Sequence, residues 1–127
     1  MKKINTDKAP AAVGPYSQAN MAGDTLYVSG QIPLDPETMQ CVEGGIKEQA
    51  KMSLTNLKNI IEEAGRKMSD VVKTTVLLDD INEFGEVNVI YEDFFGDHKP
   101  ARACYEVAKL PKGVKVEIEA IVYLDNK

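Results

Sequence analysis

Arg102 stands near the head of a strand-like stretch that runs from Pro100 to Val107, and its side chain is the first candidate for chemistry. Of the fifteen basic residues only Arg66 and Arg102 are arginines, and Arg66 follows Gly65 at a predicted helix end, where a cation is common. A planar guanidinium fixed on a strand can hold a carboxylate or a phosphate through two hydrogen bonds, which a lysine cannot do. Two interpretations follow: Arg102 clamps an anionic ligand, or it forms an ion pair that ties two strands together.

The last predicted strand, residues 115–124, carries a row of carboxylates. Its side chains alternate between two faces, and one of these faces bears Glu117 and Glu119. A solvated edge strand would explain the charges. The same face becomes apolar at Ile121, however, which indicates that a partner covers part of it. A carboxylate at that boundary can orient a water molecule or act as a general base near Arg102.

Asn88 interrupts the apolar face of the second predicted helix. An amide in such a stripe must find hydrogen-bond partners, because an unpaired buried amide is costly. Asn88 therefore either ties down a loop or offers a donor and an acceptor to a ligand. Tyr16 stands at a bend and Ser29 at a strand end, where each side chain can face a pocket, although turns of this kind are usually structural.

Cys104 lies two residues after Arg102 and therefore shares its strand face. The single histidine, His98, lies in a loop just before a proline, so it is a poor partner for a Cys–His nucleophile pair. We interpret Cys104 as a small pocket-lining residue whose backbone groups contact a ligand. No spacing of His, Cys, Asp and Glu indicates a metal site.

The elements that must position these residues follow from hydrophobic spacing and turn signals. The predicted strands are residues 16–21, 25–31, 71–78, 102–108 and 115–124, and the predicted helices are residues 46–64 and 82–95. The order β-β-α-β-α-β-β predicts an α+β sandwich, with one mixed sheet that carries two helices on one face. The other sheet face then lacks a cover within the chain, and self-association would supply it.

Length and composition indicate one domain, residues 1–127, of an ordinary soluble protein. The formal net charge of -5 argues against nucleic acid as a partner, since binding a phosphate backbone needs a basic stripe. No apolar run follows the N-terminal lysines, and no stretch is long enough to span a membrane. Two cysteines are too few for a disulfide framework. We therefore expect a cytoplasmic protein that binds neither nucleic acid nor membrane.

Five motifs resemble those of one family, with compatible spacing along nearly the whole chain. They are Ala9-Pro10-Ala11-Ala12-Val13-Gly14-Pro15-Tyr16-Ser17-Gln18-Ala19, Ser29-Gly30-Gln31-Ile32-Pro33, Val87-Asn88-Val89-Ile90-Tyr91, Pro100-Ala101-Arg102-Ala103-Cys104 and Val116-Glu117-Ile118-Glu119-Ala120. Together they resemble the RidA/YjgF family, the reactive-intermediate (enamine/imine) deaminases. The resemblance implies the chorismate-mutase-like α+β fold and a homotrimer whose sheets form a central barrel, with a cleft at each subunit interface.

The resemblance also implies an activity, the hydrolysis of 2-aminoacrylate and related enamines or imines to 2-oxo acids and ammonia. Because an imine carbon is already electrophilic, this chemistry is expected to need neither a metal nor an organic cofactor. By motif position, Arg102 would hold the substrate carboxylate, the Cys104 backbone would hold its polar end, and Glu117 would position and activate the attacking water. The other cleft residues implied by the motifs are Tyr16, Ser29 and Asn88. Part of this lining would come from the neighbouring subunit.

Two other functions compete with the deaminase. A non-catalytic protein that binds a 2-oxo acid or a similar metabolite in the same cleft would keep Arg102 but would not need Glu117. An endoribonuclease is disfavoured by the acidic balance and by the lack of interleaved aromatic and basic residues. Glu119 shares the strand face of Glu117 and is a rival for its role, since only the motif position favours Glu117.

Overall fold

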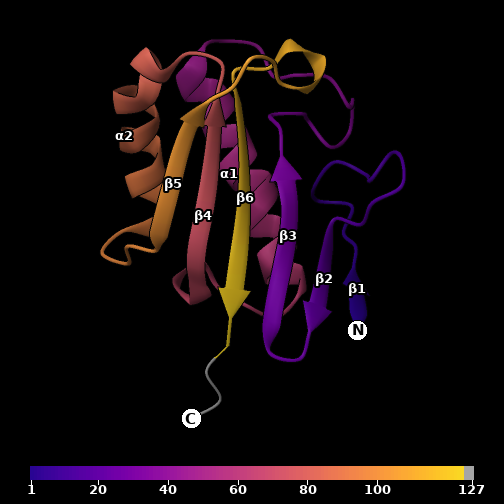
Figure 1. Ribbon diagram of the computed structural model, residues 1–127. Helices are drawn as coiled ribbons and strands as arrows, with labels where there is room; N and C mark the ends of the chain where they lie inside the picture. Colours follow the sequence, from indigo (N-terminus) through magenta and orange to yellow (C-terminus); the bar gives the residue numbers. More distant parts are fainter. Residues whose placement is uncertain (125–127) are drawn as a thin grey trace.

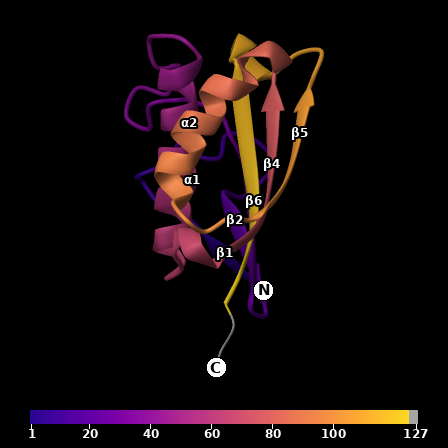
Figure 2. The same cartoon turned by 90° about the vertical axis from the view of Figure 1, so that its left-hand side faces the viewer.

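Six strands form one mixed sheet and two α-helices cover one of its faces in the computed structural model, which describes residues 1–124 (Figure 1). The strands are β1 (Lys2–Ile4), β2 (Ala19–Ala22), β3 (Thr25–Gln31), β4 (Val71–Leu78), β5 (Ala101–Glu106) and β6 (Val116–Tyr123). The helices are α1 (Ile46–Glu63) and α2 (Phe84–Phe95), with short 3-10 turns η1 (Met68–Asp70), η2 (Ile81–Glu83) and η3 (Pro111–Gly113). Both α-helices lie on the same side of the sheet (Figure 2), which confirms the predicted α+β class.

The strand order across the sheet is β1-β2-β3-β6-β4-β5. Neighbouring strands are antiparallel except β4 and β5, which run parallel because the chain returns through α2 between them. β5 is therefore one edge of the sheet and β1 is the other. The sequence did not predict β1, because its three residues are too few to show an alternation of polar and apolar side chains.

The predicted strand at residues 16–21 starts later than expected, at Ala19. The residues before Gln18 form a loop, and the buried Gln18 side chain bonds to the backbone of Thr6 and Pro10 in that loop, while its carbonyl oxygen still accepts from the Ser29 amide of β3 at 3.0 Å. The hairpin itself is confirmed, since Ala22 pairs with Thr25 across the Gly23 turn. The other predicted boundaries differ from the observed ones by no more than one turn or a few terminal residues.

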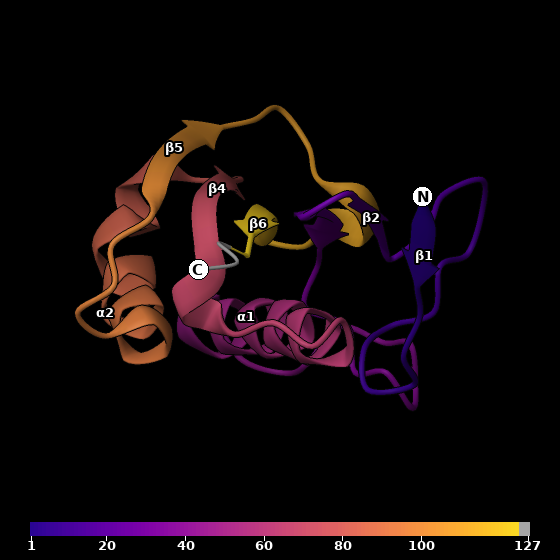
Figure 3. The same ribbon diagram turned by 90° about the horizontal axis from the view of Figure 1, so that it is seen from below.

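The core lies between the sheet and α1, which runs beneath the strands (Figure 3). Helix α1 begins after Gly45, whose amide donates to Glu48 Oε1 at 2.8 Å, and it stops before Gly65, which has a φ of 75°. The apolar stripe that predicted this helix is buried, with Leu54 and Leu57 fully inaccessible. Helix α1 thus supplies a rigid base for the loops at one end of the sheet.

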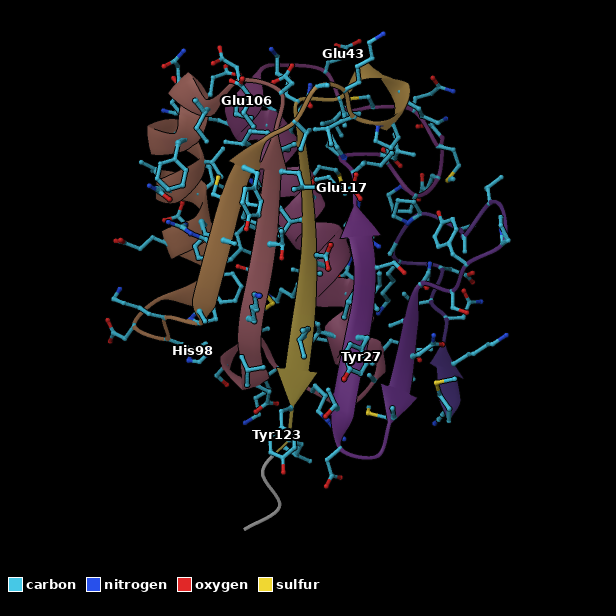
Figure 4. The ribbon with its side chains drawn as sticks, viewed as in Figure 1. Tyr27, Glu43, His98, Glu106, Glu117 and Tyr123 are labelled. Atoms are coloured by element: carbon cyan, nitrogen blue, oxygen red, sulfur yellow. The ribbon has the colours of Figure 1, made fainter. Side chains whose placement is uncertain are left out.

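Within residues 1–124 no element covers the sheet face opposite the helices. Tyr27, Tyr105 and Tyr123 on that face are 52%, 56% and 45% exposed, and Tyr27 lies beside Ile121 in the sheet register. Figure 4 marks Tyr27 on β3 and Tyr123 at the end of β6. Exposed aromatic side chains gathered on one face are typical of a surface that a partner covers. No helix within residues 1–124 is long and apolar enough to cross a membrane.

Candidate active site

Arg102 is held by three side chains of α2. Its Nη1 donates a hydrogen bond to Asn88 Oδ1 at 2.8 Å. Its guanidinium carbon lies 4.9 Å from the ring centroid of Phe84 and 4.8 Å from that of Tyr91, within the range of a cation–π interaction. We call Arg102, Asn88, Phe84 and Tyr91 the arginine cluster. The cluster fixes the plane of the guanidinium, and no carboxylate within residues 1–124 engages its other N–H groups, so they can bind a ligand.

The local sequence explains this arrangement. Phe84, Asn88 and Tyr91 stand four and three residues apart, so they share one face of α2. The parallel pairing of β5 with β4 places Arg102 beside Thr74, on the face of the sheet that α2 covers. The buried Thr74 hydroxyl is 2.8 Å from the Tyr91 hydroxyl, and this hydrogen bond fixes the position of the Tyr91 ring. Burial raises the pKa of Tyr91, so the phenol stays neutral beneath the cation.

No carboxylate within residues 1–124 forms an ion pair with Arg102; the ion pair found there joins Lys115 Nζ to Glu83 Oε1 at 3.8 Å. The interpretation of Arg102 as an ion pair between strands is therefore wrong for this part of the chain. The guanidinium instead borders a cavity of about 440 Å³ that is also lined by His98 and Lys99. An anionic ligand in this cavity can reach the Arg102 guanidinium.

Cys104 shares the helix-covered face of β5 with Arg102, as predicted, since it pairs with Val76 of β4 and packs against the core. Burial raises the pKa of the Cys104 thiol, and the nearby Arg102 charge only partly opposes this effect. His98 does not serve it as a base, because His98 Nε2 lies 2.6 Å from the Val71 carbonyl oxygen. Cys104 is therefore an unactivated thiol, and what remains for it is a contact through its backbone.

A second set of predicted site residues surrounds another cavity, which has a volume of about 730 Å³. Tyr16, Ser29 and Glu117 line this cavity together with Gly30, and we call these four residues and their cavity the glutamate pocket. Its remaining walls are mostly apolar: Pro10, Ala11, Val13, Ile32, Leu34, Met39 and Pro111. Ser29 is partly committed, because its hydroxyl donates to the Ser17 carbonyl oxygen at 2.6 Å.

Glu117 rests against the backbone of Gly30. The register of β3 against β6 shifts between Val28 and Gln31, so β3 has a bulge at Ser29 and Gly30. A Cβ atom placed on Gly30 would lie 2.8 Å from Glu117 Cδ and would collide with Oε2. The bulge and the missing side chain together leave the space that the Glu117 carboxylate occupies.

The electrostatic surroundings favour proton uptake by Glu117. Its pKa is raised, first by burial of the carboxylate and second by the charge of Glu119 two residues along the same strand face. Lys112 lines the same pocket, and Lys115 of the preceding turn is engaged with Glu83. A carboxylate whose pKa is raised is a better general base and, once protonated, a usable general acid near neutral pH.

The arginine cluster and the glutamate pocket lie on opposite faces of the sheet. Arg102 pairs with Thr74 of β4 and Glu117 with Leu77 of the same strand. Thr74 and Leu77 are an odd number of residues apart, so they point to opposite faces. β4 also separates β5 from β6, so the two backbones are about 10 Å apart. One copy of the chain therefore does not bring Arg102 and Glu117 together.

Comparison with known proteins assigns the chain to a family. The family model described as Endoribonuclease L-PSP matches residues 6–124. The rat 2-iminobutanoate/2-iminopropanoate deaminase is 58% identical over 120 residues, which cover 94% of this chain and 88% of the rat protein. A solved structure from Thermotoga maritima superposes with a TM-score of 0.97 at 48% identity and covers 99% of each chain. The structure of Escherichia coli TdcF, solved with bound serine, has a TM-score of 0.94 at 42% identity and covers 98% of this chain and 100% of TdcF.

These likenesses first define a class, the chorismate-mutase-like α+β proteins with one mixed sheet and two helices on one face. Within that class the chain belongs to the family described as Endoribonuclease L-PSP, which is the RidA/YjgF family that its motifs resemble. The fold and the family expected from the sequence are both confirmed.

The sequence did not predict the side chains that hold the two key groups. Phe84 and Tyr91 belong to the apolar face that Asn88 interrupts, and their spacing around Asn88 is the sequence signal for two rings and an amide that surround one guanidinium. Gly30 was predicted only as part of the strand at residues 25–31. Its close approach to Glu117 depends on the strand bulge. A glycine inside a predicted strand is a signal for such a bulge, but it does not indicate which side chain fills the space. Within residues 1–124 no group of three or more His, Cys, Asp or Glu side chains is placed to hold a metal ion.

Proposed function

We propose that this protein is a cofactor-independent deaminase that hydrolyses 2-aminoacrylate and related enamine or imine intermediates to 2-oxo acids and ammonia. The observation that carries the proposal is the arginine cluster: a guanidinium fixed by Asn88 and two rings, with no carboxylate of residues 1–124 against it. Such a group suits a 2-imino acid, whose carboxylate sits next to the reacting carbon. Relatives 54–58% identical to the chain are named 2-iminobutanoate/2-iminopropanoate deaminase, which supports the same substrate class.

In the proposed reaction, Arg102 binds the substrate carboxylate and the Cys104 backbone binds its polar end. Glu117 accepts a proton from a water molecule as the water oxygen bonds to the iminium carbon, giving a carbinolamine. Glu117 then returns the proton to the nitrogen and the carbon–nitrogen bond breaks. The hydroxyl proton leaves with the departing ammonia as ammonium, so the products are a 2-oxo acid and an ammonium ion. An iminium carbon is already electrophilic, so binding and one aimed water suffice for this chemistry.

We further propose that the working form is a homotrimer in which the arginine cluster of one subunit meets the glutamate pocket of the next. Two features support this assembly. Arg102 and Glu117 lie on opposite faces of one chain, and the exposed tyrosines on the open sheet face need a cover. In the composite cleft Tyr16 and Ser29 from one subunit and Asn88 from the other would complete the lining. We treat residues 1–127 as a single domain of this trimer.

The second candidate is a protein that only binds a 2-oxo acid in the same cleft. It would use the arginine cluster but would have no need of a carboxylate with a raised pKa in the facing pocket, so the surroundings of Glu117 favour the enzyme. The net charge of -5 opposes a role as a ribonuclease or any other binding to nucleic acid. Free thiols at Cys41 and Cys104 are compatible with the reducing cytoplasm in which we place the protein.

The activity is tested by generating 2-aminoacrylate in situ with a dehydratase and measuring release of the 2-oxo acid with and without the protein. Wild-type protein should accelerate release, and Arg102→Ala and Glu117→Gln should each abolish the acceleration. Wild-type protein that binds 2-oxo acids without accelerating release would establish the binding protein instead. Retention of full activity by Arg102→Ala would refute the role of the clamp.

The composite cleft is tested by mixing the two inactive variants. If each site takes Arg102 from one subunit and Glu117 from another, random co-assembly of equal amounts of Arg102→Ala and Glu117→Gln chains restores about a quarter of the sites. If both residues act within one chain, mixing restores none. Light scattering on the same samples gives the oligomeric state, and a monomer at micromolar concentration would contradict the trimer.

A further inference from the structure

Four amide side chains are buried within residues 1–124. One of them, Gln31, bonds to the Ser29 carbonyl oxygen only two residues away, whereas the other three lie next to the glutamate pocket and reach more distant segments. Gln18, Gln49 and Asn56 are only 2%, 7% and 0% exposed. A buried amide without partners destabilises a fold, so amides at core positions must be used by the structure. Each of the three hydrogen-bonds to backbone atoms of a segment that is distant in sequence.

Gln18 holds the N-terminal wall of the pocket. Its Oε1 accepts from the Thr6 amide at 2.8 Å, and its Nε2 donates to the Thr6, Ala9 and Pro10 carbonyl oxygens at 3.1, 3.4 and 2.9 Å. The chain that leaves Pro10 lines the pocket and leads to Tyr16. Gln18 therefore makes most of the side-chain hydrogen bonds that hold this wall, and Asn59 of α1 adds one to the Lys8 carbonyl oxygen at 2.8 Å.

Gln49 and Asn56 stand seven residues apart on α1, so they share one helix face. Asn56 Nδ2 donates to the carbonyl oxygens of Ile32 and Leu34 at 3.3 and 2.9 Å, and both of these residues line the pocket. Gln49 Oε1 accepts from the Lys115 amide at 2.8 Å. Helix α1 thus holds a second wall and the start of the strand that carries Glu117.

We propose that Gln18, Asn56 and Gln49 are positioning residues that tie three parts of the glutamate pocket to the rigid core. Gln18 holds the N-terminal wall, Asn56 holds the wall that follows β3, and Gln49 holds the start of the strand that carries Glu117. Directional hydrogen bonds from buried side chains fix a loop in one place, whereas apolar packing alone lets it slide. The inference rests on the proposed function, because it assigns the amides to the same reaction. None of the three contacts the reacting atoms, and each acts through the wall that it holds.

Gln49 gives the sharpest test, because it makes one hydrogen bond to a residue close to the chemistry. Lys115 precedes Glu117 by two residues and lies on the same face of the chain. Loss of the Gln49 bond should therefore displace the carboxylate that aims the water. Arg102, which binds the substrate carboxylate, lies outside this pocket. The expected effect falls on kcat and leaves KM largely unchanged.

The experiment compares three variants of the full chain. Gln49→Met has a similar length but no acceptor, Gln49→Glu keeps an acceptor oxygen, and Ser53→Ala alters the same face of α1. Ser53 is fully buried but its hydroxyl has no hydrogen-bond partner within residues 1–124, so it tests general packing of the helix. We expect Gln49→Met to lower kcat about tenfold with KM within threefold, because a shift of a fraction of an ångström misplaces the water. Gln49→Glu should recover most of kcat, and Ser53→Ala should match the wild type.

Hydrogen exchange of the Lys115 amide is measured in parallel, because it reports the bond without depending on activity. Exchange should be faster in Gln49→Met and unchanged in Ser53→Ala. Unchanged exchange and kcat in Gln49→Met, or equal losses in Ser53→Ala, would overturn the positioning role. If wild-type protein has no deaminase activity, the proposed function fails, while the exchange result still decides whether Gln49 holds the strand.

Discussion

Replacing Gly30 by alanine should move the Glu117 carboxylate without disturbing the fold. The new Cβ would lie 2.8 Å from Cδ and 3.0 Å from Cγ of Glu117, and ordinary contacts begin at 3.4 Å. The carboxylate must therefore move by about 1 Å, and a misplacement of that size costs about 100-fold in rate. We expect kcat to fall by about 100-fold, which corresponds to about 2.7 kcal/mol in the activation free energy.

The stability of the Gly30→Ala variant should hardly change. Gly30 is not among the glycines with a left-handed backbone, so alanine can adopt its conformation. The displaced group is the end of a flexible side chain, and alanine restricts the unfolded chain more than glycine by about 0.4–1 kcal/mol. We expect the free energy of unfolding, measured by urea denaturation, to stay the same or to rise within that range.

The assay is the coupled release of 2-oxo acid, with kcat and KM determined separately. Gly85→Ala is the matched control, because Gly85 lies in α2 and a Cβ there would meet no atom within 4 Å. That variant should keep the wild-type kcat. The double variant Gly30→Ala/Glu117→Gln should be no slower than Glu117→Gln alone, since Gly30 acts only through Glu117. A folded, trimeric Gly30→Ala protein with the wild-type kcat would show that the carboxylate is not seated by Gly30.

Three further changes test the charges of the site. Asn88→Asp puts a carboxylate within reach of Arg102, where it competes with the substrate carboxylate, so KM should rise about tenfold; an unchanged KM would contradict the clamp. Glu119→Gln removes the charge that helps to raise the pKa of Glu117, so the acid limb of the kcat/KM profile should move to lower pH, and a move to higher pH would contradict the assignment. Glu117→Gln should unfold with a free energy a few tenths of a kcal/mol higher than wild type near pH 7, because water screens the half-buried carboxylate. The raised pKa means that the charged form opposes folding, so this difference should grow as pH rises above the ordinary glutamate pKa and vanish below it.

The sequence was sufficient for most of the elements because each long element shows its own period. Residues 46–64 repeat apolar side chains every three or four positions, and 115–124 alternate, so α1 and β6 appear where predicted. β1 and the start of β2 were not predictable in this way. β2 begins just after Gln18, whose side chain hydrogen-bonds to Thr6 twelve residues earlier in the chain. The spacing of apolar residues within one segment gives no information about contacts with a distant segment.

The sequence predicted a set of candidate site residues but not how they are distributed between the two faces of the sheet. β5 reads Ala-Arg-Ala-Cys-Tyr-Glu, a stretch with no clear apolar face, so alternation alone does not tell which side Arg102 takes. Its position is set by the parallel pairing with β4 and by the aromatic seat on α2, both of which are tertiary. The opposite placement of Glu117 follows only once the order β6-β4-β5 is known.

The division of the site between two faces makes the proposed chemistry depend on assembly. Within one chain, β4 and the thickness of the sheet separate Arg102 from Glu117, so neither loop motion nor a side-chain rotation joins them. Both groups lie on strands that pack against the core. Arg102 is hydrogen-bonded to Asn88, and Glu117 rests against Gly30. In the proposed assembly, the distance between Arg102 of one subunit and Glu117 of the next is then set by how the sheets of the two subunits pack together. If the proposed trimer forms, a substitution on the open face, at Tyr27 for example, should therefore change kcat as well as the stability of the assembly, even though the Tyr27 side chain lines neither cavity.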